Sequence, residues 1–194
     1  MSDAAFTILR EGEEQRALDV LVTAFTADPV LRWMYPDATR YLTRFPAFLR
    51  AFGGKAFTSG TVWRLGDFEA VALWFPPNVG PDDDAVIAEI TNSVNPDQHG
   101  DVFAVLEQMG TAHPTFPHWY LPWFGVDGGR QGKGIGSELL RNCLAVVDAD
   151  HLPAYLESPN PRNLSFYERH GFEVTGVSQA GACPPVYSMQ RSSH

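Results

Sequence analysis

Two hydrophobic periods alternate along the chain. Apolar runs of four to eight residues predict β-strands, and they occur at residues 6–10, 61–65, 69–75, 119–126, 154–157, 172–177 and 186–189. Apolar positions spaced three or four residues apart predict amphipathic helices, and they occur at residues 13–27, 39–52, 82–93, 98–110, 135–147 and 161–170. Strand pairs interrupted by helices predict an α+β fold in three α/β/α layers, with a mixed, twisted sheet of about six to seven strands and helices on both faces.

Prolines mark the breaks in this pattern. Asp28-Pro29 is expected to end the first helix, and Trp33 to Pro36 is interpreted as an aromatic loop. Pro122 falls inside the strand at 119–126, where it removes a backbone donor that a sheet would use. A proline there is tolerated at a sheet edge or at a distortion such as a bulge. The strand is therefore expected to lie at an edge or to part from one neighbour.

Three glycines alternate between strand 119–126 and the helix that follows. They lie in Arg130-Gln131-Gly132-Lys133-Gly134-Ile135-Gly136-Ser137. The first turn of a helix has unpaired N–H groups and a partial positive charge, so residues without side chains let a phosphate approach closely. The pattern predicts an anion cradle, with an ordinary glycine-rich turn as the alternative.

Two familiar phosphate loops fit these letters poorly. A P-loop would need glycine at the position of Asp127 and Ser or Thr at the position of Gly134, so that interpretation fails. A dinucleotide-binding fingerprint starting at Gly132 would need glycine where Ser137 stands, and Glu157 falls only roughly where its acidic residue belongs. It remains a weak alternative.

The segment 156–172 forms a second motif. Pro161 suits a first helical turn, and Gly171 suits the position just past a helix end, which predicts a helix of about ten residues. Asn163 and Tyr167 are four residues apart, so both are expected to project from one face of this helix.

Together the two motifs resemble the signatures of the GNAT superfamily of N-acyltransferases. Gln131-x-x-Gly134-x-Gly136 is similar to its acyl-CoA pyrophosphate loop, and 156–172 is similar to its second signature. Within the superfamily, the set is most similar to puromycin N-acetyltransferase and its relatives. The strong match spans residues 119–172. The first half, which builds most of the substrate pocket in this family, matches weakly.

The resemblance implies that the strand before the glycine loop bulges and parts from its neighbour, leaving a V-shaped slot for the pantetheine arm. It also implies acetyl-CoA as the co-substrate, and no metal. In this family the residue matching Asn163 helps to hold the CoA arm, and the one matching Tyr167 points its hydroxyl at the thioester sulfur. A half-buried packing tyrosine is the alternative. The expected contacts to coenzyme A are Phe124, Gly125, Val126, Gln131, Gly132, Lys133, Gly134, Ile135, Gly136, Ser137, Asn163 and Tyr167.

The expected chemistry requires few side chains. An amine must lose a proton before it attacks a thioester, because an ammonium group has a pKa of about 10 and no free lone pair. Glu157 is the first candidate base and His118 the second; a surface carboxylate and an exposed loop histidine are the alternatives. Tyr167 is the candidate acid for the departing thiolate. Direct transfer needs no catalytic cysteine, and Cys143 is expected in the core.

Aromatic residues are candidates for the acceptor pocket, where they could hold a cationic or ring-bearing amine, although core packing is the alternative. These residues are Trp33, Tyr35, Trp74 and Trp119. The net charge of −9 argues against general nucleic-acid binding and suits amines. The acidic run Asp82 to Asp84 is expected to begin a solvated helix. Without a long apolar segment or a leader-like start, we expect a cytoplasmic protein with no membrane partner.

We therefore predict one GNAT acetyltransferase domain over residues 1–194 that transfers an acetyl group directly from acetyl-CoA to a primary amine of a small molecule. One alternative is a catalytically silent domain that binds or senses acyl-CoA. Another is an acetyltransferase of protein N-termini or lysines. The sequence leaves open whether the subunit acts alone or as a homodimer.

Overall fold

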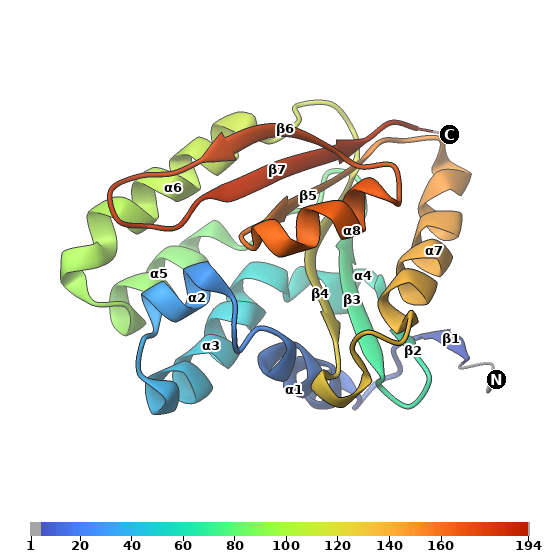
Figure 1. Ribbon diagram of the computed structural model, residues 1–194, viewed down its shortest axis with the longest axis horizontal. Helices are drawn as coiled ribbons and strands as arrows, with labels where there is room; N and C mark the ends of the chain where they lie inside the picture. The colour runs from blue at the N-terminus through green and yellow to red at the C-terminus, as the bar shows by residue number, and fades with distance from the viewer. Residues whose placement is uncertain (1–4, 194) are drawn as a thin grey trace.

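The computed structural model describes residues 5–193 and is organised around one sheet (Figure 1). The strands follow the order β1-β2-β3-β4-β5-β7-β6, and neighbours are antiparallel except β4 and β5, which are parallel. Residues 1–4, part of the segment that suggested the lack of a leader, lie outside the described residues. The strands are β1 Phe6–Ile8, β2 Val62–Leu65, β3 Ala70–Phe75, β4 Trp119–Val126, β5 Ala154–Ser158, β6 Glu173–Ser178 and β7 Val186–Arg191.

Helices cover both faces of this sheet, giving the three layers visible in Figure 1. One face packs against helices of the first half of the chain, and the other packs against α7 and α8. No helix within residues 5–193 is long and apolar enough to cross a bilayer. The helices are α1 Glu14–Ala24, α2 Pro29–Met34, α3 Ala38–Gly53, α4 Lys55–Ser59, α5 Asp83–Ser93, α6 His99–Ala112, α7 Ile135–Val147 and α8 Leu164–Glu168.

The predicted strands and long helices are confirmed, but two short helices were not expected. The first helix ends at Ala24, before Asp28-Pro29, and this pair begins α2 instead. The Asp28 carboxylate accepts the Leu31 N–H at 3.0 Å, and Pro29 fits the first turn. The supposed loop at Trp33 is therefore partly helical. The helix α4 has five residues and ends at Gly60 with φ 67°. Helices this short carry too few turns for a hydrophobic period to show.

A bulge distorts β4 at Pro122. Leu73 lies opposite Trp123, whereas Phe75 lies opposite Tyr120. Two steps along β3 therefore face three steps along β4, so β4 contains one extra residue here. Consequently Tyr120 and Trp123 pack in the same core cluster, although they are three positions apart on a strand. The bulge accommodates a residue that has no N–H to donate, as the sequence predicts.

The parting of β4 from β5 is also confirmed. Their parallel pairing covers three positions and ends at Leu121 and Leu156. Beyond that point β4 stays paired with β3 as far as Val126, while β5 stays paired with β7 as far as Ser158. The two strands therefore diverge, and the candidate site lies in the opening between them.

Candidate functional site

The glycine loop leads into α7 without a capping side chain. Asp28, Asp37 and Asp82 each accept a backbone N–H at the start of α2, α3 and α5, so the acidic run does cap a helix. At α7 the capping position is Gly134, and no side chain of the described chain accepts an N–H there. The first amides of α7 are open to an external acceptor, which is the property that an anion cradle requires.

Gly132 and Gly134 have φ angles of 75° and 82°, in the left-handed region that side chains disfavour. A Cβ on either residue would meet no atom of residues 5–193 within 4 Å, so open space surrounds the loop. Gly136 is different, because its Cβ would lie 3.2 Å from Cγ2 of Val126. The three glycines therefore have two different causes: backbone conformation at Gly132 and Gly134, and close packing at Gly136.

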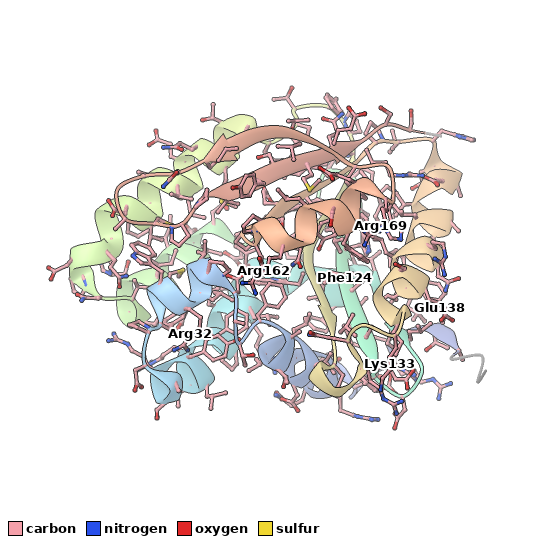
Figure 2. The ribbon with its side chains drawn as sticks, viewed as in Figure 1. Arg32, Phe124, Lys133, Glu138, Arg162 and Arg169 are labelled. Atoms are coloured by element: carbon pink, nitrogen blue, oxygen red, sulfur yellow. The ribbon has the colours of Figure 1, made fainter. Side chains whose placement is uncertain are left out.

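Contacts within the loop hold its shape. The Gly129 N–H donates to Asp127 Oδ1 at 2.9 Å, and Lys133 Nζ donates to the Gly129 carbonyl at 3.1 Å. Arg130 pairs with Glu69 at 3.2 Å. Figure 2 shows Lys133 beside the loop between β4 and α7. Lys133 and Arg130 are exposed and bring positive charge to the cradle of an otherwise acidic protein.

The opened half of β4 forms one wall. The Phe124 ring packs against Phe166 with centroids 5.7 Å apart, and it lies between the loop and α8 (Figure 2). Gly125 packs closely against α1, because a Cβ there would lie 2.9 Å from Leu21 Cδ2. Helix packing is therefore sufficient reason for a glycine at this position, whatever its backbone amide binds.

Asn163 and Tyr167 do lie on one wall of the same cavity. A 3₁₀ turn at Pro161–Asn163 precedes α8, and the helix ends at Glu168, earlier than predicted. Tyr167 is 8% exposed, and its hydroxyl has no hydrogen-bond partner within residues 5–193. Burial raises the pKa of Tyr167, so the phenol stays protonated at neutral pH and can donate a proton.

The cavity occupies the opening between β4 and β5 and measures about 1000 Å³, including the part open to solvent. Its wall is mainly apolar, with side chains from α2, α3, α5 and α6 joining those of β4. The ionisable side chains on the described wall are Asp28, Tyr120, Glu157, Tyr167 and Cys183.

Glu157 lies between this cavity and a pair of histidines. Its side chain is 6% exposed; Oε1 is 3.6 Å from His113 Nδ1, while Oε2 is buried without a hydrogen-bond partner in the described chain. His118, the second candidate base, does not line the cavity. Its Nε2 is 2.9 Å from Nε2 of His113, and its Nδ1 is 2.7 Å from the Phe116 carbonyl. The two candidate bases are therefore connected through His113.

Two phenols flank the carboxylate. Burial, and then the charge of Glu157, raise the pKa values of Tyr120 and Tyr155, so both remain protonated. Across the cavity, Asp28 is 5% exposed, and burial raises its pKa to about 6. Burial also lowers the pKa of His118, which favours its neutral form.

The four aromatic residues expected in an acceptor pocket are not brought together. Trp74 and Trp119 pack in the core under α7, with their rings 6.5 Å apart. Tyr35 is fully buried on the other face of the sheet, where its hydroxyl contacts Ser93 Oγ at 2.7 Å. Trp33 packs beside α6, and none of the four lines the cavity. Core packing explains Tyr35, Trp74 and Trp119, and the expected grouping is not seen in the described cavity.

The cavity has its own aromatic residues, which the sequence did not single out. Trp123 is surrounded by the rings of Phe25, Phe45, Phe48 and Phe52 at 5.1 to 6.3 Å. Trp123 moves to this face because of the bulge, a displacement that strict strand alternation could not reveal.

Neither cysteine is prepared for nucleophilic chemistry. Cys143 is buried in the core under α7 as expected, and burial raises its pKa to about 12. Cys183 borders the cavity, and burial raises its pKa to about 11. Both thiols are therefore protonated at neutral pH. Within residues 5–193 there is no group of three His, Cys, Asp or Glu side chains that could hold a metal ion.

Comparison with known proteins agrees with this geometry. Residues 46–172 match the model of the acetyltransferase (GNAT) family. The chain belongs to the GNAT acetyltransferase family. It is 25% identical over 177 residues to an uncharacterised N-acetyltransferase of Schizosaccharomyces pombe, covering 81% of this chain and 70% of the relative. GNAT enzymes generally use acetyl-CoA, and the open amides of α7, the glycines beside them and the parted strands fit that molecule.

Solved GNAT structures share the fold. A histone acetyltransferase HPA2-related protein of Corynebacterium glutamicum superposes with a TM-score of 0.69 at 22% identity, covering 99% of this chain and 97% of the other. Arylalkylamine N-acetyltransferase 2 of Aedes aegypti superposes with a TM-score of 0.68 at 11% identity, covering both chains completely. At these identities the likeness shows the GNAT fold alone.

Two residues of this GNAT site were missed by sequence reasoning. Asp28 was interpreted as a helix end, but a carboxylate that caps a helix can also face a cavity when the helix is buried. His113 lies at the end of α6 and was assigned no function. A histidine five residues before His118, in a proline-rich loop between helix and strand, was the available signal.

Proposed function

We propose that this protein is an acetyl-CoA-dependent N-acetyltransferase whose acceptor is a small primary amine with an apolar body. The observation that carries the proposal is the cavity at the parting of β4 and β5. There a buried carboxylate, Glu157, and a buried phenol, Tyr167, share one mainly apolar wall beside the uncapped start of α7.

The cradle would hold the cofactor through backbone groups. The amides of Ile135, Gly136 and Ser137 would bind the pyrophosphate, while Lys133 and Gln131 flank it from the loop. Asn163 and the opened part of β4 would contact the pantetheine arm. Such a site needs no side-chain cap on α7 and no bulk at Gly132 or Gly134, which is what the structure has.

Proton transfer would then involve two groups. Glu157 Oε2 has no partner in residues 5–193, so it is free to accept a proton from an incoming ammonium group. Tyr167 stays protonated and would donate to the departing thiolate. Direct attack of the amine on the thioester is consistent with the two protonated cysteines.

The shape of the cavity supports a small acceptor. Its lining comes from several helices as well as from β4, β5 and β7, so it is enclosed on many sides, unlike an open groove for a peptide. The aromatic cluster around Trp123 suits a ring or alkyl group, and two carboxylates suit one ammonium group. The motif resemblance to puromycin N-acetyltransferase adds an aminated drug to this class. Membership of that group and a cytoplasmic location remain predictions, and the oligomeric state stays open.

The test is thiol release from acetyl-CoA with a panel of amines at pH 7 to 9. Arylalkylamines and alkyl monoamines are expected to be faster than polyamines and than peptides with a free N-terminus or lysine. Greater activity on the peptides would favour a protein acetyltransferase. If acetyl-CoA raises the melting temperature but no amine releases thiol at any pH, the protein is instead a silent acyl-CoA-binding domain.

A further inference from the structure

The proton that Glu157 would accept has a restricted way out. The carboxylate is 6% exposed, and its cavity side would be covered by the bound amine. Tyr120 is buried, and Tyr155 is buried with its hydroxyl bonded to Ser188 Oγ at 3.0 Å. His113 is 29% exposed and lies 3.6 Å from Oε1. Of Tyr120, Tyr155 and His113, the described ionisable groups that flank Glu157 most closely, His113 is the one that also reaches solvent.

We propose that Glu157, His113 and His118 form a proton relay that carries the acceptor's proton from the cavity to solvent, with the two histidines as positioning residues. The inference rests on the proposed function, because it assigns the exit route of that reaction. It adds a role for His113, and it gives His118 a place beside Glu157 instead of one competing with it.

The hydrogen bonds fix the direction of the relay. A carbonyl only accepts, so His118 Nδ1 must carry the proton that points at the Phe116 carbonyl. Neutral His118 then accepts at Nε2, and His113 Nε2 must be the donor in the 2.9 Å contact. The remaining nitrogen, His113 Nδ1, faces Glu157. The contact between Glu157 and His113 is favourable when one proton lies between them, either on the carboxyl group or on Nδ1.

The proton balance follows from the reaction. An ammonium group and an acetyl thioester give an amide, a thiol and one proton. The first ammonium proton passes to Glu157 Oε2, and the N–C bond forms as the C–S bond breaks. The second nitrogen proton replaces the one that Tyr167 gives to the thiolate. One proton is left on Glu157. Rotation of the carboxyl group turns this proton from the cavity toward His113 Nδ1, and the proton then leaves through His113 and His118. The separation of 3.6 Å must shorten for transfer, as is usual for catalytic contacts in unliganded sites.

Several groups of the described chain surround His113. Glu157 faces it from β5, His118 from the loop, and the rings of Tyr155 and Tyr120 lie 4.6 and 4.9 Å away. Burial and the neighbouring His113 lower the pKa of His118, so His118 is neutral and able to accept a proton at neutral pH. If His113 served only for packing, its ring would be required but its two nitrogens would not, so a phenyl ring could replace it.

The test compares two substitutions at one position. His113→Phe keeps a ring between the two tyrosines but cannot carry a proton, and His113→Ala leaves space for a small base. Both should lower kcat about tenfold, less than the 10²- to 10⁴-fold typical of losing a base, with an unchanged KM for acetyl-CoA. Added imidazole should restore only the alanine variant. His99→Ala removes a half-buried histidine at the start of α6, bonded to the Val94 carbonyl, and should retain full activity.

Full kcat in His113→Phe, or a loss in His113→Ala that imidazole does not restore, would overturn the relay. His118→Ala, at the other histidine of the relay, provides a second site for the same measurement.

A readout on the free protein separates this inference from the proposed function. Nitrogen-15 NMR of the imidazoles should find the proton of His118 on Nδ1 and a proton on His113 Nε2. The opposite tautomers would reject the relay even if the enzyme acetylates amines, whereas these tautomers without amine-dependent thiol release would reject only the function.

Discussion

Replacing Asp28 with Asn should stabilise the protein, and increasingly so as the pH rises. Burial raises the pKa of Asp28 from 3.8 to about 6, so its ionised form is disfavoured in the folded state. The group's contribution to stability is fully present below the unfolded pKa and is lost as the pH rises through the folded one. Asn keeps the capping acceptor for Leu31 N–H but carries no charge.

The magnitude follows from the two pKa values. A difference of one pKa unit corresponds to about 1.4 kcal/mol, so the ionised carboxylate costs about 3 kcal/mol at pH 7.5 and roughly half of that at pH 5. The stabilisation by Asp28→Asn should therefore grow by about 1.5 kcal/mol between these two pH values. Urea unfolding of both proteins at each pH measures it, because the linear extrapolation gives the free energy of unfolding.

Asp37→Asn is the matched control. Asp37 caps α3 with the same geometry, accepting the Arg40 N–H at 2.8 Å, but it is exposed. Its substitution should change stability by a similar small amount at both pH values. If Asp28→Asn shows no more pH dependence than Asp37→Asn, the carboxylate is not desolvated and the cavity wall near α2 is wetter than its burial indicates.

Three further substitutions test the site and its scaffold. Tyr167→Phe should lower kcat at least tenfold in thiol release while acetyl-CoA affinity stays within about twofold, because only proton donation is lost. Gly134→Ala should cost about 1 to 2 kcal/mol in urea unfolding through its φ of 82°, and should weaken acetyl-CoA binding at least tenfold by calorimetry because a methyl group enters the open space. Gly125→Ala should cost about 1 to 3 kcal/mol in urea unfolding, because its Cβ would overlap α1.

Gly12→Ala is the control for Gly134→Ala. Gly12 has a φ of 84° and open space around it, far along the chain from the cradle, so it should show the same strain without any loss of acetyl-CoA affinity. Equal affinity in both variants would mean that the cofactor does not approach Gly134. An unchanged turnover with a large loss of affinity in Tyr167→Phe would reject the acid role.

The parts of this fold that could be predicted are those encoded locally. Strand and helix periods, the proline that disrupts β4, and the glycines before α7 are properties of neighbouring residues, and the structure agrees with them. The spacing of four residues between Asn163 and Tyr167 likewise predicts that they lie on the same side, and both line the cavity.

The acceptor side could not be predicted in the same way. Aromatic side chains are abundant, and which of them faces the cavity depends on a one-residue bulge that moves Trp123 to that face. The contact between His113 and Glu157 joins segments 44 positions apart, 157 − 113, across a loop. Asp28 reaches the cavity only because α2 folds over it. Each of these features depends on tertiary packing, which leaves no repeating hydrophobic pattern in a single sequence.

The short parallel pairing between β4 and β5 separates two portions of the sheet that contribute different residues to the cavity. On one side of it, β1 to β4 and helices α1 to α6 supply most of the cavity wall. On the other side, β5 to β7 and α8 supply Glu157 and Tyr167. Only three residue pairs join the two portions of the sheet at this boundary. If the protein acts as proposed, substitutions in the first portion should change which amine is accepted, while Glu157 and Tyr167 on the second portion stay in place.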